Sequence, residues 1–123
     1  MRNVVIVSVA QTEHKGEARD AFYELAFRAA KAALDEVGLD RTSIDTVITA
    51  GWDEVDGRTI AGMYLEPASG GYLKETSKVA EDAIFSAAYA YMRIASGHFD
   101  TALVVGHGHK ESDFQQVSHF CFD

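Results

Sequence analysis

The stretch Val79–Gly106, VAEDAIFSAAYAYMRIASGHFDTALVVG, decides the fold because a helix-type pattern leads directly into a strand-type one. Its first part places apolar side chains at helical spacing, and Gly97 follows where the left-handed residue that ends a helix is expected. Residues 101–106 then form the continuous apolar run of a strand that is buried on both faces. We therefore predict a helix from about residue 79 to residue 96 and a buried strand over residues 101–106.

The same alternation of patterns extends toward the N-terminus. Val4–Val9 is a β-branched run that predicts a strand inside a sheet, and residues 20–37 carry a helical apolar stripe that Gly38 ends. Residues 44–50 supply a second buried strand. Alternating strands and helices predict an α/β fold with a mainly parallel sheet covered by helices on both faces.

The segments between these elements are polar or rich in glycine. Residues 51–71 hold five glycines and Pro67, which predicts an irregular excursion with a short helix near residues 59–65. Its glycines lack the spacing and the Lys-Ser/Thr ending of a phosphate loop. Tyr72–Val79 is polar enough to predict an edge strand. Residues 107–123 form a polar tail without clear periodicity.

Size and charge restrict the classes of function. The chain of 123 residues predicts a single domain over residues 1–123, and its net charge of -8 argues against nucleic acid and anionic lipid as partners. That charge also gives no long-range attraction for coenzyme A. No apolar run is long enough to span a membrane. The single cysteine and the absence of a secretory pattern after Met1 predict a cytoplasmic protein.

Several strings, in this order and spacing, resemble the thiolase superfamily. They are the opening VVIVSVAQT of residues 4–12, GLDRTSID of residues 38–45, IASGHFDTALVVG of residues 94–106 and KES of residues 110–112. The likeness is to the lipid-transfer-type and archaeal acetyl-CoA acetyltransferase branch, and it covers only the N-terminal half of such a chain. The resemblance implies a thiolase-like βαβαβ half.

The resemblance also implies where a reactive group would stand. The family begins its second helix with a nucleophilic cysteine, since a helix N-terminus lowers the pKa of a thiol that accepts an acyl group. Counting back from Gly97 puts that position on Ala80, which cannot be acylated. Glu81 and Asp82 follow it as weak candidates for a general base, although carboxylates in a first turn commonly stabilise the helix end. The family's His-Gly and second-cysteine motifs belong to a C-terminal half that this sequence lacks.

Other chemically active side chains lie in the tail and in the glycine-rich excursion. The spacing of His107, His109, His119 and Cys121 matches no tetrahedral zinc pattern, so we expect no metal site and treat these histidines as exposed loop residues. Cys121 is a poor alternative nucleophile with only His119 near it in sequence. Trp52 and Tyr64 are candidates for an acyl pocket, an interface or a cover over the core.

Two functions stay open on the sequence. The chain is either a subunit or fragment of a thiolase-like enzyme that makes or breaks a carbon–carbon bond in acyl-CoA with a partner half, or a non-catalytic scaffold that retains the dimerising surface. In both we expect no bound cofactor, with acyl-CoA as the implied substrate. A half domain leaves apolar surface uncovered around Ala83, Ala87 and Tyr91, which predicts a homo- or hetero-oligomer.

Overall fold

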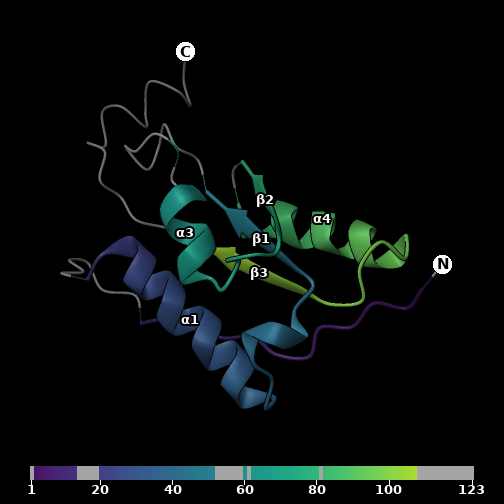
Figure 1. Cartoon of the computed structure of the whole chain (residues 1–123), viewed down its shortest axis with the longest axis horizontal. Coiled ribbons are helices and arrows are strands. Elements are labelled where there is room, and N and C mark those ends of the chain that lie inside the picture. The colour runs from purple at the N-terminus through teal and green to yellow at the C-terminus, as the bar shows by residue number, and fades with distance from the viewer. Residues whose placement is uncertain (1, 14–19, 52–59, 61, 81, 108–123) are drawn as a thin grey trace.

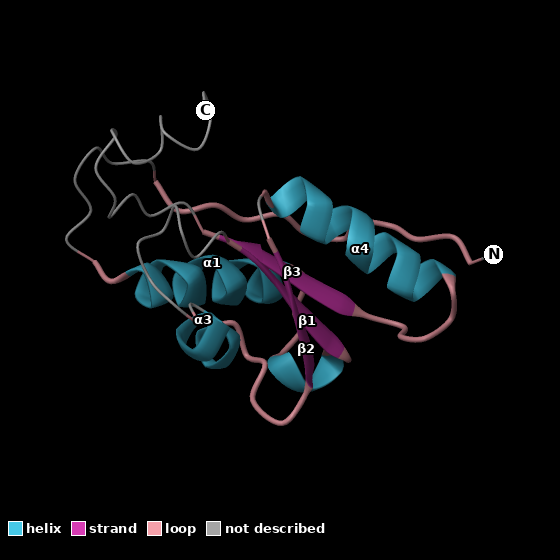
Figure 2. Ribbon diagram, turned by 90° about the horizontal axis from the view of Figure 1, so that it is seen from above, coloured by secondary structure: helices cyan, strands magenta, loops and turns pink. Residues whose placement is uncertain are grey.

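A three-stranded parallel sheet lies between two layers of helices in the computed structural model, which describes residues 2–13, 20–51, 60, 62–80 and 82–107 (Figure 1). The strands are ordered β2-β1-β3, and they are β1 (Thr46–Ala50), β2 (Glu75–Val79) and β3 (Ala102–Gly106). Helices α1 (Phe22–Glu36) and α3 (Gly62–Ala68) cover one face of the sheet, and α4 (Ala83–Ala95) covers the other (Figure 2). The predicted α/β class with a parallel sheet is confirmed.

Strand β1 occupies the centre, and all five of its residues are buried. Its register places Ile48 between Ser77 of β2 and Val104 of β3. A continuous apolar and threonine-rich sequence suits this position because both faces of a central parallel strand are covered. The predicted strand over residues 44–50 is therefore observed, beginning two residues later.

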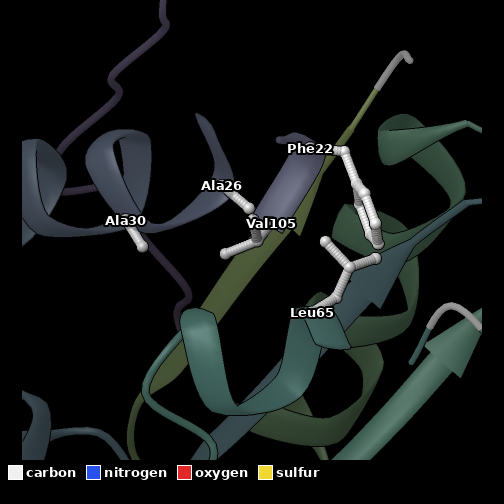
Figure 3. Close-up of a cluster of buried hydrophobic side chains, with 5 residues drawn as sticks. All are labelled: Phe22, Ala26, Ala30, Leu65 and Val105. Atoms are coloured by element: carbon white, nitrogen blue, oxygen red, sulfur yellow. The ribbon is translucent and has the colours of Figure 1, made fainter. Parts of the chain in front are cut away.

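The core on the α1 face follows from the periodicity of that helix. Phe22, Ala26 and Ala30 recur every four residues and are buried against Leu65 of α3 and Val105 of β3 (Figure 3). Val37 and Gly38 follow α1, and Gly38 adopts φ 67 at the position where the sequence predicted a left-handed residue.

On the opposite face, α4 is joined to the outer strand by a polar cluster. The Arg93 guanidinium lies 2.7 Å from the Glu75 carboxylate and also donates to the Tyr89 hydroxyl at 2.9 Å. Burial raises the pKa of Glu75, but hydrogen bonds from Thr46 and Arg93 outweigh it and hold that pKa below its usual value. The polar composition of β2 thus serves an edge strand, and its predicted edge position is confirmed.

The predicted strand Val4–Val9 is wrong for the described chain. These residues form no strand, and Val5, Ile6, Val7 and Val9 are 65–83% exposed. A β-branched run becomes a strand only where a partner offers backbone hydrogen bonds, and no backbone bond from a described residue reaches residues 4–9. Side chains hold this N-terminal segment instead. Arg2, just before it, forms an ion pair with Asp100, and the Ser8 hydroxyl donates a hydrogen bond to the Glu36 carboxylate at 2.5 Å.

Three further boundaries differ from the sequence predictions. The excursion contains an ordered helix, α3, that begins later than the predicted short helix and includes Pro67 in its last turn. Helix α4 begins at Ala83 rather than near residue 79, because Asp82 caps it. Strand β3 is the end strand opposite β2 in the sheet of the described residues and is mostly half-buried, whereas its sequence predicted a buried strand. None of the helices in the described part of the chain is long and apolar enough to cross a membrane.

The turn that leads into β2 holds a side chain in an unfavourable backbone conformation. The Lys74 N–H donates to the Gly71 carbonyl at 2.9 Å and closes a turn in which Leu73 has φ 61. Leu73 is 85% exposed, so no packing compensates for the close approach of its Cβ to the backbone.

We predict that Leu73→Gly raises the free energy of unfolding by about 0.5–1 kcal/mol, since glycine removes the left-handed strain and loses some of that gain to unfolded-chain entropy. Urea unfolding followed by circular dichroism measures the change. Leu73→Ala, which keeps a Cβ and the strain, is the matched control and should leave the midpoint unchanged. A Gly variant no more stable than the Ala variant contradicts the prediction.

Asp45 fastens the loop that leads into β3. Its Oδ2 accepts the backbone N–H groups of Asp100 and Thr101, each at 2.9 Å, and these bonds lower the pKa of Asp45. Because the pKa of Asp45 is lower in the folded state, its carboxylate stabilises the folded protein fully at pH values above the unfolded-state pKa of about 3.9. This contribution disappears as the pH falls through the folded-state pKa.

We predict that Asp45→Asn costs about 1 kcal/mol of stability at neutral pH, because a neutral amide is the weaker acceptor. The cost should shrink as the pH falls below about 4. Urea titrations at a series of pH values check both points. A cost that is the same at neutral and acid pH would show that the carboxylate charge has no part in it.

Candidate active site

The carboxyl ends of the three parallel strands meet at one edge of the sheet. Strand β1 ends at Ala50, Ala80 follows β2, and His107 follows β3. The register keeps these ends level, since Ala50 lies opposite both Val79 and Gly106. In open α/β sheets this edge is where ligands bind, because loops and helix N-termini collect there.

The turn from β2 to α4 places the expected reactive position at this edge. Ala80 is exposed and directly follows β2, three residues before the first residue of α4. Asp82 is the N-cap of α4, and its Oδ1 accepts the Ile84 N–H at 3.2 Å. The carboxylate thereby satisfies one of the free N–H groups of the first turn. Glu81 lies outside the described residues.

Two small residues set how closely α4 approaches the sheet. A Cβ built on Gly106 would lie 2.7 Å from the Cβ of Ala83 and 3.8 Å from that of Ala50. Ser86, one turn further, is fully buried, and its hydroxyl donates to the Thr49 carbonyl at 3.5 Å. The start of α4 therefore rests directly on the carboxyl ends of β1 and β3.

His107 belongs to the site rather than to an exposed tail, which corrects the sequence expectation for this residue. It is half-buried, and its Nδ1 lies 2.9 Å from the Ala50 carbonyl. The imidazole ring also lies 5.4 Å from the Phe22 ring. A polar side chain is thus positioned between the ends of β1 and β3, on the edge to which Ala80 belongs.

An aromatic group lines the site edge on the α1 side of the sheet. Phe22 meets Tyr64 edge to face at 6.1 Å, and Tyr64 stacks on Tyr23 at 6.4 Å. Tyr64 thus covers the core and remains about half exposed. The sequence singled out Tyr64 and placed Phe22 on the apolar stripe of the first helix, which agrees with the burial of Phe22 in the core, but it did not indicate the contact with Tyr23.

The remaining sequence candidates cannot be placed at this edge. Trp52, His109, His119 and Cys121 lie outside the described residues. Among the residues that the structure does describe, no group of three or more His, Cys, Asp or Glu side chains is arranged to hold a metal ion. The described site consequently has one imidazole, one capping carboxylate and a methyl group at the strand–helix turn.

Comparison with known proteins identifies the fold. No family model and no curated protein sequence matches the chain. Among solved structures, it is similar to 3-oxoacyl-[acyl-carrier-protein] synthase III from Aquifex aeolicus VF5, with a TM-score of 0.62 and 20% sequence identity. The match covers 80% of this chain and 33% of the synthase, so this chain spans about one third of that protein's length. The chain has the thiolase-like fold of that neighbour.

We predict that Gly106→Ala costs about 1–3 kcal/mol, because the added methyl group requires α4 or β3 to shift. The double variant Gly106→Ala with Ala83→Gly removes the opposing methyl group and should recover most of the loss. Thermal or urea unfolding of the two single variants and the double variant gives the coupling energy. Strictly additive losses would show that the two residues do not press on each other.

Proposed function

We propose that this chain is a thiolase-like subunit or fragment that takes part in carbon–carbon bond formation or cleavage on an acyl thioester, together with a partner that carries the rest of the catalytic machinery. The implied substrate is acyl-CoA. The proposal depends on one observation above all, which is the strand–turn–helix corner at residues 79–83 in a fold shared with a 3-oxoacyl-[acyl-carrier-protein] synthase.

The geometry of the corner supports a site for a developing negative charge. In the first turn of α4, Asp82 accepts the N–H groups of Ile84, Phe85 and Ser86, so what the corner offers a negative charge is the positive end of the helix dipole. Such an end stabilises a thiolate or an oxyanion at the carbonyl of a bound thioester. Asp82 occupies part of this position and adds a negative charge, so capture of an anionic substrate would need positive groups from elsewhere.

A partner supplies what this corner lacks. Ala80 has no nucleophile, and the acid–base residues of a condensing reaction would come from a second chain or from a further part of a longer one. The match to only one third of the synthase supports an incomplete catalytic unit. Among the described residues, His107 brings an imidazole to the same edge of the sheet through its contact with the Ala50 carbonyl, and its contact with Phe22 places the ring on the α1 side.

A non-catalytic role is the second candidate, and a specific observation favours it. The turn after β2 presents a methyl group where the resemblance implies a thiol, and Asp82 already serves as a helix cap. In that role the chain stabilises or dimerises a thiolase-like complex and contributes no reactive group. Purification of the tagged chain from its native host distinguishes the two: a stoichiometric companion with His and Cys motifs supports the catalytic role.

We predict that Ala80→Cys, in a Cys121→Ser background, becomes acylated by acetyl-CoA. The thiolate attacks the thioester carbonyl, and the coenzyme A thiolate leaves and takes up a proton. Near the helix N-terminus the thiol pKa should fall, which we expect to accelerate acylation about tenfold over an ordinary exposed cysteine. Intact-protein mass spectrometry over time measures the added acetyl group.

Ala88→Cys in the same background is the matched control, since Ala88 is exposed in the middle of α4, away from the helix start. Alkylation by iodoacetamide at several pH values separates a lowered pKa from substrate binding. If the two thiols react equally with both reagents, the corner does not activate a nucleophile, and the catalytic proposal fails.

A further inference from the structure

An uncharged, mainly aromatic patch lies on the surface of the helical layer that α1 and α3 form (Figure 2). Tyr64 of α3 stacks on Tyr23 of α1 with ring centroids 6.4 Å apart, and Phe27 lies one helical turn after Tyr23. Met63 precedes Tyr64 on α3. These four side chains, Tyr23, Phe27, Met63 and Tyr64, are 46–67% exposed, and we call them the α1–α3 patch.

The area of the α1–α3 patch suits a short segment of chain. An aromatic side chain buries about 150–250 Å² when it leaves water, so four half-exposed side chains of this size offer about 400 Å². The largest apolar patch on a typical monomer covers about 300–600 Å² and is often functional. A stable interface between two folded proteins needs about 800 Å² from each partner. The patch is therefore large enough to bind a segment and too small to hold a second folded copy by itself.

The last described residue of the chain lies beside this patch. The ring of His107 is 5.4 Å from the ring of Phe22. Phe22 in turn meets Tyr23 at 5.6 Å and Tyr64 at 6.1 Å, edge to face in both cases. The segment that follows His107 is thus tethered next to the α1–α3 patch, and a short tether gives an effective concentration on the order of millimolar.

Residues 114–122, with the sequence FQQVSHFCF, form the apolar part of a tail that is otherwise polar. They contain three of the seven phenylalanines of the chain and no Asp, Glu, Lys or Arg. Such a segment matches an uncharged aromatic patch, because neither surface has to desolvate a charge on contact. From His107 an extended chain reaches about 23 Å by Phe114, which is several times the one helical turn between Tyr23 and Phe27.

We infer that residues 114–122 dock on the α1–α3 patch of the same chain. The phenylalanine rings of the segment cover the exposed parts of the patch, and the unbranched side chain of Met63 adapts to them. The α4 surface also exposes apolar side chains, such as Ile84 and Phe85, but the contact of His107 with Phe22 brings the end of the described chain to the α1 side. The docked segment then covers the site edge on the side where His107 lies.

A nitroxide attached to Cys121, the single cysteine of the chain, tests the docking by nuclear magnetic resonance. The spin label accelerates the relaxation of nearby nuclei. In the unaltered chain we therefore expect the amide signals of Phe27 and Tyr64 to be strongly broadened. The amide signal of Met92 should stay sharp, because α4 lies on the opposite face of the sheet (Figure 2).

Variants on both surfaces show whether the broadening reports a specific contact. Phe27→Ser removes an aromatic ring from the patch and should lower the relaxation enhancement at Tyr64 about tenfold. Phe120→Ser removes a ring from the segment and should have the same effect. Phe85→Ser on α4 is the matched control, since Phe85 is 54% exposed and Phe27 is 51% exposed, and it should leave the enhancement unchanged. Far-UV circular dichroism confirms that each variant is folded.

Equal broadening of α1 and α4 in the unaltered chain overturns the inference, as does an enhancement at Tyr64 that both Phe27→Ser and Phe120→Ser leave unchanged. A mixture of spin-labelled chain with unlabelled, ¹⁵N-enriched chain shows which molecule supplies the segment. Broadening of the enriched chain in that mixture contradicts docking within one chain. The measurement uses no thioester and no partner, so the docking and the proposed chemistry can fail separately.

Discussion

Parallel pairing of β1 with a strand on each side is the constraint on which the rest of the structure depends. It commits the backbone groups of β1 to two neighbours and leaves both of its faces to be covered by side chains from helices. Parallel neighbours also require the chain to return over the sheet between strands, which α3 and α4 accomplish. The same pairing aligns the carboxyl ends of all three strands, so the fold itself creates the edge at which Ala80, Asp82 and His107 lie.

Features that depend on short stretches of chain were predictable from the sequence. The period of α1, the end of α1 at Gly38 and the end of α4 at Gly97 each reflect local geometry, and Gly97 adopts φ 82 as such a helix end requires. Val4–Val9 shows where local patterns stop being sufficient. Its β-branched composition makes an extended backbone favourable, but a strand exists only if a neighbouring backbone is available, and composition carries no information about that neighbour.

In the candidate site, too, features set by local sequence were predictable and contacts between distant parts of the chain were not. The strand-to-helix turn near Ala80 was predictable because the pattern change is local. The sequence nevertheless placed Ala80 at the start of the helix, whereas the structure places it three residues before the first residue of α4. The contact between His107 and Ala50 joins residues 57 positions apart, and nothing in the tail sequence indicated it. The close packing of Gly106 on Ala83 is similar, since a glycine at the end of an apolar strand has several ordinary explanations until the helix is placed above it.

The interactions that position the strand–turn–helix corner do not depend on the side chain at position 80. Helix α4 is held there by the Asp82 cap, by the contact of Ala83 with Gly106 and by the buried Ser86, and none of these interactions involves the side chain of Ala80. A thiol or a methyl group at that exposed position would therefore leave the frame unchanged. The same frame suits both the catalytic and the structural role proposed for this chain. The difference between these roles lies in the group at position 80 and in the residues that a partner would contribute, and not in the fold.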